Sequence, residues 1–275
     1  MLKVFLIALQ IIVLLIFPCL FIACDDDPAS SSDANQWVQR KSGTTEHLCD
    51  VAWNGAKFVA TGWDIILASP DGVVWTKQNL PAEYQSNGYI LNNVVWSESH
   101  QIFLVTGDYN IIMTSPDGFV WTMQESGREW GFIQSAAACD TLLIISFYNP
   151  IVLLVSRDGI NWTAYPDIGP FDKMASSDSL LIGVGNSQIQ SSGNGIDWTL
   201  RHSGDSLIHC ISRFETAGKW VAAGHLGYFL KSSNGFDWTS FEAGAGDVST
   251  LLDAYSSSTS CMVVGHANGP GLIMN

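Results

Sequence analysis

A short repeated motif constrains the fold of this chain more than any other feature of its sequence. The stretch from Ser69 to Thr76 reads Ser-Pro-Asp-Gly-Val-Val-Trp-Thr. Further copies keep Ser, then Asp or Asn, then Gly, and finally Trp-Thr at the same offsets; they occupy 115–122, 156–163, 192–199 and 232–239. Internal periodicity with a spacing of about 40 residues is typical of repeat architectures.

Each copy of the motif predicts a tight turn between two strands. Proline sets φ at about −65°, aspartate accepts backbone N–H bonds, and glycine takes the left-handed position. The residue two before each Trp is apolar in every copy: Val73, Phe119, Ile160, Ile196 and Phe236. Because side chains two apart in a strand share a face, we expect this face to be buried and the Trp to act as a structural staple.

The first 23 residues have the composition of a targeting segment. Lys3 gives a basic start and residues 4–23 are almost wholly apolar, so they are excluded from fold reasoning. Phe21-Ile22-Ala23-Cys24 resembles the lipobox of bacterial lipoproteins, which implies a lipid on Cys24 and a membrane-anchored protein of the periplasm or cell surface. An uncleaved membrane anchor and a plain cleaved signal peptide are the alternatives. Residues 24–32 are acidic and small, and we expect a flexible tether.

Residues 33–275 carry the features of an all-β domain. Glycine and short β-forming runs are frequent, and no long segment has the 3.6-residue period of a helix. Each unit offers four strands; the first unit places them at 48–53, 57–62, 65–69 and 73–77, and the second at 91–97, 102–107, 111–115 and 119–124. Four-stranded units of about 40 residues are typical of β-propeller blades.

The two ends of the chain determine the expected number of blades. After Trp238 only three strands follow, at 251–255, 261–265 and 272–274. A counterpart of the missing fourth strand occurs at 31–38, where Ser, Asp and Trp37 match the repeat. We therefore predict a six-bladed β-propeller in which the N-terminal strand closes the last blade and leaves no exposed strand edge.

These motifs resemble those of a known class of repeat proteins. Trp37 to Thr45, Val51-Ala52-Trp53 and Ser69-Pro70-Asp71-Gly72 look like bacterial surface and secreted proteins built from tandem SPDGxxWT repeats. Those repeats are similar to the Asp-box (BNR) repeats of sialidase-like propellers, although here Gly directly follows Asp and Thr follows Trp. The resemblance covers about residues 31–275, and it implies a propeller fold in which the motif is structural.

The net charge and the cysteines limit which partners and which disulfide bonds are expected. The net charge is −14, from 12 basic and 26 acidic residues, and no basic run exists. A nucleic-acid partner is therefore not expected, and membrane contact is expected only through the lipid. Outside the N-terminal segment the cysteines are Cys49, Cys139, Cys210 and Cys261. We expect free buried thiols; if one disulfide forms, Cys49 with Cys261 is the expected pair.

Topology selects the face on which a ligand is expected. In an up-and-down blade, the hairpin between strands two and three and the linkers between blades lie opposite to the Asp/Asn-Gly turns, and function collects on variable loops. The residue after the second-strand glycine, or its equivalent, is polar or aromatic in each unit: Trp63, Asp108, Tyr148, Asn186, His225 and His266. We predict that these six residues surround one mouth of the central channel and bind a ligand; the alternative is ordinary turn polarity.

The connecting loops on the same face supply further polar and aromatic side chains: Tyr84, Tyr89, Arg128, Trp130, Asp167, His202 and Asp247. Three sharper hypotheses rank below a binding role. A sialidase would need converging arginines, but Arg157 lies on the wrong face. His225, His266 and Asp64 could hold a transition metal, although no short ligand motif supports this. Asp64 and Asp108 could act as the acid and base of a glycosidase.

From these observations we expect a monomeric binding or scaffold module for a protein or glycan partner, with neither a cofactor nor a metal. The alternative is a carbohydrate-active enzyme, a glycoside hydrolase or lyase, that uses the same loop face.

Overall fold

The computed structural model describes residues 40–84, 88–214, 218–241, 248–256, 261–267 and 272–274. Within these ranges the protein is all-β, and its helical structure is limited to the short 3-10 turn η2 (Asp108–Asn110). No helix of the described part is long and apolar enough to cross a membrane. Cys24, the targeting segment and the expected closing strand at 31–38 lie outside the described residues.

Antiparallel sheets follow one another along the chain. The first contains β1 (Leu48–Trp53), β2 (Phe58–Gly62), β3 (Ile65–Ser69) and β4 (Thr76–Lys77). The second contains β5 (Asn93–Ser97), β6 (Ile102–Gly107), β7 (Ile111–Ser115) and β8 (Thr122–Met123). The third contains β9 (Phe132–Cys139), β10 (Leu142–Asn149), β11 (Val152–Ser156) and β12 (Trp162–Pro166).

The fourth sheet contains β13 (Lys173–Ser176), β14 (Leu181–Gly185), β15 (Gln188–Ser192) and β16 (Thr199–Ser203). The fifth contains β17 (Ile208–Phe214), β18 (Lys219–Gly224), β19 (Phe229–Ser232) and β20 (Thr239–Phe241). A three-stranded sheet follows with β21 (Val248–Ser256), β22 (Cys261–Ala267) and β23 (Leu272–Met274). Strands pair in sequence order in all of these sheets.

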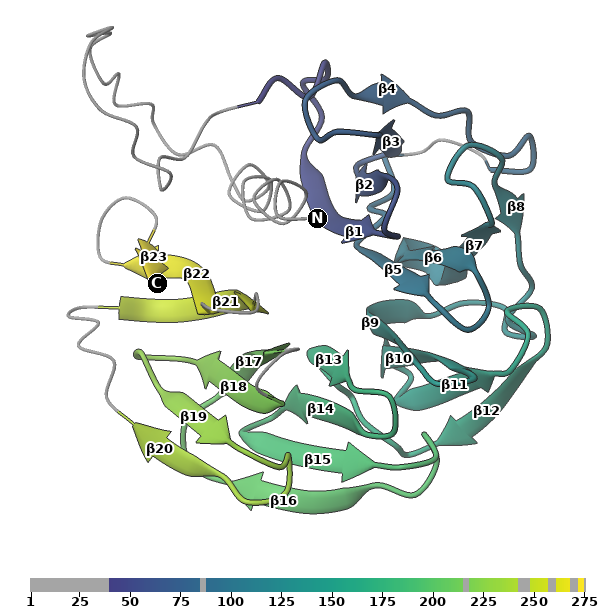
Figure 1. The fold of residues 1–275 in the computed structure, drawn as a ribbon. Helices are drawn as coiled ribbons and strands as arrows, with labels where there is room; N and C mark the ends of the chain where they lie inside the picture. The colour runs from purple at the N-terminus through teal and green to yellow at the C-terminus, as the bar shows by residue number, and fades with distance from the viewer. Residues whose placement is uncertain are drawn as a thin grey trace, which may run out of the picture.

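The sheets are arranged around a common centre (Figure 1), and the first strand of each four-stranded sheet lies innermost and the fourth outermost. First strands of successive sheets contact one another: β1 with β5, β5 with β9, β9 with β13, β13 with β17, and β17 with β21. This radial arrangement of up-and-down sheets is that of a β-propeller.

The core lies between neighbouring sheets rather than inside any one of them. Val59 and Ile66 of the first sheet pack with Phe103 and Met113 of the second, and similar clusters join the second sheet to the third, the third to the fourth and the fourth to the fifth. Central strands are therefore covered on both faces, which explains why β2 and β3 are buried along their whole length.

The repeated motif forms a turn that is held by its own side chains. Ser69 Oγ accepts the Gly72 N–H at 2.8 Å and donates to Asp71 Oδ1 at 3.1 Å. The same Oδ1 accepts the N–H groups of Val73 and Val74 at 2.8 and 3.0 Å. Equivalent bonds form in the other copies, where the acceptor is Asp117, Asp158, Asn194 or Asn234.

The expected burial of the residues two before the Trp is wrong. Val73, Phe119, Ile160 and Phe236 are all exposed. The Asp or Asn oxygen captures the two N–H groups that precede the Trp, so the backbone stays in the turn and the fourth strand begins at the Trp or one residue later. The pleated alternation that we assumed from residue 73 onwards therefore does not apply to this segment.

The motif Trp residues nevertheless make structural contacts. Trp121 is buried and joins the core between the first and second sheets. In three other copies the indole N–H donates to the carbonyl oxygen of the turn glycine at 3.1–3.2 Å; these residues are Trp75, Trp198 and Trp238.

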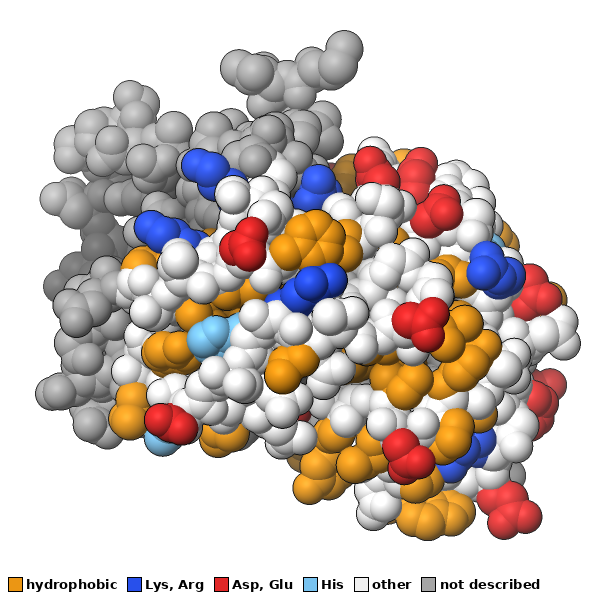
Figure 2. Space-filling model, turned by 90° about the horizontal axis from the view of Figure 1, so that it is seen from below, with side chains coloured by type: hydrophobic (Ala, Val, Ile, Leu, Met, Phe, Trp, Pro, Cys, Tyr) orange, Lys and Arg blue, Asp and Glu red, His pale blue; other side chains and the backbone are white. Residues whose placement is uncertain are grey.

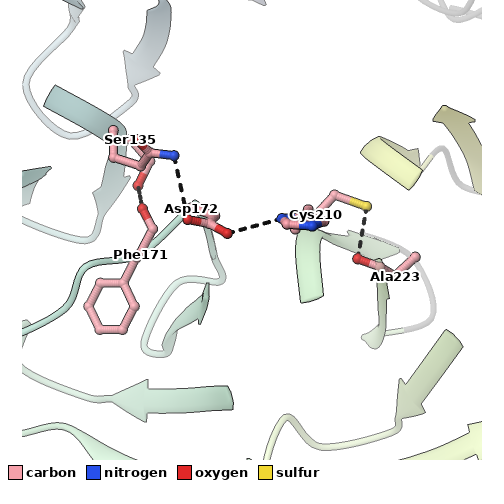
Figure 3. A network of polar contacts seen from close by, with 7 residues as sticks. Ser135, Phe171, Asp172, Cys210 and Ala223 are labelled. Carbon is pink, nitrogen blue, oxygen red and sulfur yellow. Dashed lines mark hydrogen bonds and ion pairs between the residues drawn. The ribbon is translucent and has the colours of Figure 1, made fainter. Parts of the chain in front are cut away.

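Polar contacts also join the inner parts of neighbouring sheets (Figure 3). Ser135 Oγ in β9 donates to the carbonyl oxygen of Phe171 at 2.8 Å. Asp172, just before β13, accepts a long hydrogen bond from Gln134 Nε2 at 3.4 Å and lies 3.1 Å from His209 Nδ1 in β17. One carboxylate therefore contacts the first strands of the sheets on both sides of its own.

Cys49, Cys139 and Cys210 form no disulfide, as expected, and Cys49 is only partly buried. The side chain of Cys261 lies outside the described residues. Burial, with a smaller contribution from nearby carboxylates, raises the pKa of Cys49 and of Cys139 to about 11. Thiols with such pKa values are protonated at neutral pH and react slowly.

Candidate functional site

Three hairpins on the face opposite to the Asp/Asn-Gly turns are hydrogen-bonded to the linkers that enter their own sheets. The N–H groups of Trp63, Asp108 and His225 donate to the carbonyl oxygens of His47, Ile90 and Leu207 at 3.0, 2.9 and 2.9 Å. The preceding residue is glycine in each case, and an added Cβ would lie 2.0, 2.5 or 1.9 Å from the same oxygens. Glycine is required there because the linker backbone passes so close, while the next side chain is free to vary.

The structure places the predicted residues on these hairpins but does not join them into a cluster. Trp63, Tyr148, Asn186 and His225 are exposed, and Asp108 is half-buried. His266 belongs to β22 opposite Thr250, and its side chain is not described. Within the described ranges no hydrogen bond, ion pair or ring contact links any two of the six.

A different group of side chains is in contact on this face. The ring of Tyr109 lies 4.8 Å from the ring of Tyr89 and 5.8 Å from the ring of Phe132, between centroids. Tyr109 is 59% exposed and Phe132 41% exposed. We call Tyr89, Tyr109 and Phe132 the aromatic strip; it extends from the linker between the first and second sheets, over the η2 hairpin, to the start of the third sheet.

Tyr109 was missed because its hairpin is longer than that of the first sheet. Two residues separate β2 from β3, whereas the three residues of η2 separate β6 from β7. Tyr109 occupies the left-handed region with φ +54°, and the next residue, Asn110, fixes the turn: its N–H donates to Gly131 O at 3.0 Å and its Nδ2 to Arg128 O at 2.9 Å. The additional residue between Gly107 and Ile111 is the sequence signal that could have revealed it.

Asp64 holds the linker that carries Tyr89. Its Oδ1 accepts the Tyr84 hydroxyl at 2.5 Å and the Tyr89 N–H at 3.1 Å, and its Oδ2 accepts the Gly88 N–H at 2.6 Å. Burial, and then the hydrogen bond to Asp64, raises the pKa of Tyr84 well above its usual range. The Asp64 carboxylate is thus used for structure, which argues against its use as a glycosidase acid or a metal ligand.

No group of three His, Cys, Asp or Glu side chains that could hold a metal ion occurs among the residues that the structure covers. Asp108 Oδ2 accepts the Ile90 N–H at 3.3 Å.

Exposed aromatic residues on the turn face already have partners from their own chain. Lys57 Nζ lies 3.8 Å from the centroid of Phe119 and donates to the Asp117 carbonyl oxygen at 2.6 Å. The guanidinium of Arg201 lies 4.7 Å from the centroid of Phe236. Figure 2 views the molecule from below Figure 1, the side on which β15, β16, β19 and β20 lie, and shows basic, acidic and hydrophobic side chains interspersed there.

No protein-family model and no curated protein matches this chain. Solved structures do match its fold. A structure of YCF48 bound to a D1 peptide is 18% identical with a TM-score of 0.64, over 83% of this chain and 78% of that one. YCF48 from Cyanidioschyzon merolae is 15% identical with a TM-score of 0.64, over 87% and 85%. The WD40 β-propeller domain of Doa1 is 12% identical with a TM-score of 0.63, over 89% and 84%. These similarities show a β-propeller fold.

Proposed function

We propose that this chain is a monomeric protein-binding scaffold that recognises its partner through the aromatic strip. The observation that carries the proposal is the contact between Tyr89, Tyr109 and Phe132, which come from three different loops or strands and leave two of the rings exposed. Aromatic rings supply contact area at low entropic cost and are enriched among residues that dominate binding. The propeller neighbour YCF48, which is bound to a peptide in its structure, supports the same class of function.

A glycan partner, or an enzyme acting on carbohydrate, is the alternative that the same face could serve. The two classes are separated by exposing the protein to a library of displayed random-sequence peptides and, in parallel, to an array of immobilised glycans. We expect peptides to be enriched and the glycan array to give no signal that depends on the aromatic strip.

The variant that tests the site is Tyr109→Ala combined with Phe132→Ala. It should weaken binding of the enriched peptides at least about tenfold. Phe236→Ala is the matched control, because Phe236 is 41% exposed, as Phe132 is, but lies on the turn face; it should bind the peptides normally. If the double variant binds as the wild type does, or if only glycans bind, the proposal fails.

We also propose that the propeller has six blades and that residues 31–38 complete the last one. Described residues at the edge of the first sheet support this. Arg40 to Thr45 and the side chains of Ile65, Leu67 and Trp75 line a cavity of about 740 Å³. An apolar sheet face beside the start of the described chain is where a neighbouring blade would pack.

The anchor is the third part of the proposal. The apolar segment and Ala23-Cys24 support a lipid on Cys24 that tethers the propeller outside the bacterial cytoplasm. The resemblance of the repeated motif to those of SPDGxxWT-repeat proteins of bacterial surfaces agrees with that location.

A further inference from the structure

The loops around the aromatic strip carry far more negative than positive charge. The described parts of the two hairpins and two linkers, residues 63–64, 78–84, 88–92, 108–110 and 124–131, contain the carboxylates of Asp64, Glu83, Asp108, Glu125 and Glu129. Arg128 is their single Lys or Arg side chain, and its guanidinium lies 5.6 Å from the centroid of Phe147. Its charge is therefore directed at the molecule's own core.

Two exposed aromatic rings on the turn face, and one half-buried ring, are covered by the protein's own cations. Phe119 is covered by Lys57, Phe236 by Arg201, and the half-buried Phe241 by Lys231 at 5.3 Å. Among the described residues, no Lys or Arg lies over Tyr109 or Phe132. The negative face of an aromatic ring attracts cations, so the exposed rings of Tyr109 and Phe132 offer a site for a cation from a partner.

Asp108 lies beside the most exposed ring of the strip. It precedes Tyr109 in η2, and only its Oδ2 accepts a hydrogen bond from a described residue, the long one from Ile90. Oδ1 is left to accept a charged donor. A carboxylate oxygen and an aromatic face in adjacent residues are complementary to the charged group and the methylene chain of a long cationic side chain.

We infer that the aromatic strip binds a Lys or Arg side chain of a basic peptide segment in the partner, with the cation over Tyr109 and its N–H groups donating to Asp108. This inference rests on the proposed function and names the chemistry of its partner. The carboxylates of the surrounding loops would draw such a segment to this face, and the effect should weaken as salt screens the charges.

The test uses the peptides that the wild-type chain enriches from the random-sequence library. We expect Lys or Arg at one shared position. Replacing that residue by neutral citrulline, or by glutamine where it is Lys, should weaken binding at least about tenfold. Binding should also weaken between low and high NaCl concentrations.

A double-mutant cycle assigns the effect to the proposed contact. In Asp108→Asn the citrulline or glutamine substitution should have a clearly smaller effect, because only the contact with the Tyr109 ring remains. In Asp205→Asn it should keep its full effect, because Asp205 is an exposed carboxylate of the linker between the fourth and fifth sheets. Asn keeps an acceptor for the Ile90 N–H, so the fold should be retained. Tyr109→Leu, which keeps bulk but loses the aromatic face, provides an independent variant.

Enriched peptides without a shared Lys or Arg, or additive effects of the two substitutions, would overturn the inference. The proposed function would still stand in that case if the double variant at Tyr109 and Phe132 weakens binding. If that variant binds peptides normally, both proposals fail.

Discussion

In each copy of the repeated motif, the Asp or Asn side chain at the third residue accepts hydrogen bonds from two backbone N–H groups. In three of the copies this side chain is a carboxylate. Hydrogen bonds from the backbone N–H groups two and three residues later lower the pKa of Asp71 and of Asp117. For Asp158, the Asn161 side chain contributes most to the lowering of the pKa. Asn194 and Asn234 make the same backbone bonds with a neutral amide oxygen. The geometry therefore needs an acceptor, while the charge is optional.

That difference predicts how the protein responds to acid. A carboxyl whose folded-state pKa lies below the unfolded value of about 3.9 stabilises the fold above that pH, and the contribution is lost as pH falls through the folded pKa. The combined variant Asp71→Asn, Asp117→Asn and Asp158→Asn should fold at neutral pH and show a flatter loss of stability below about pH 4. Urea unfolding followed by circular dichroism across this range measures it.

An unchanged acid dependence in this variant would contradict the role of the three carboxylates. The copies with Asn194 and Asn234 provide the internal precedent that an amide is tolerated at this position.

At the scale of elements, the turns of the second to fifth sheets are also contacts with the preceding sheet. The turn glycine of the third sheet, Gly159, has φ +73°, and an added Cβ would lie 2.9 Å from Ile102 Cδ1 in the second sheet. Gly195 lies in the same way against Ile144 in the third. The motif thus closes its own hairpin and positions it against its neighbour.

A pair of glycine substitutions separates these two roles. Gly127 has the same φ of +73° with nothing within 4 Å of an added Cβ, so Gly127→Ala should cost about 1–2 kcal/mol of unfolding free energy from backbone strain alone. Gly159→Ala should cost a further 1–3 kcal/mol or so because the methyl group overpacks the sheet contact. Chemical denaturation of both variants measures the difference, and equal losses would refute the contact.

How well the elements could be predicted depends on which force positions them. The bounds of β1, β3, β6, β7 and β23 agree with the expected strands, because apolar runs bounded by turn residues leave little choice. The predicted fourth strands begin too early in the sequence. The Asp or Asn side-chain oxygen accepts the N–H groups of the two residues before the Trp, so these groups do not pair with the third strand. At the site, Tyr89 and the hairpin face were anticipated. Tyr109 was missed because the sequence analysis took the residue directly after Gly107, which assumes that all hairpins have the same length.

At the scale of the whole molecule, the closure proposed above would make the two ends of the propeller depend on each other. Deleting residues 31–42 removes the strand proposed to pair with β23 and should leave a pairing edge that promotes association. Light scattering after size-exclusion chromatography should then show aggregates. Deleting residues 25–30 of the tether is the control and should leave a monomer. A deletion variant of 31–42 that stays monomeric and equally stable would argue against closure.

The proposed anchor predicts a covalent modification of the whole protein. In a bacterial host, Cys24→Ser should abolish incorporation of labelled fatty acid and block lipoprotein-type processing. Cys19→Ser, inside the targeting segment, should leave both intact. Lipid on the Cys24→Ser variant, or a mature N-terminus other than residue 24, would exclude the lipobox.

Because the strands of each four-stranded sheet are neighbours in sequence, their pairing involves short loops and little loop-closure entropy. A chain made from its N-terminus can therefore assemble its first sheets on the ribosome before β21 to β23 have been synthesised. Completion of the last sheet by residues 31–38 would then be a late event, in which a segment made early waits for strands made last. Until that moment the face of the first sheet that carries Ile65 and Leu67 would lack its proposed neighbour, and the nascent chain would be most in need of a chaperone there.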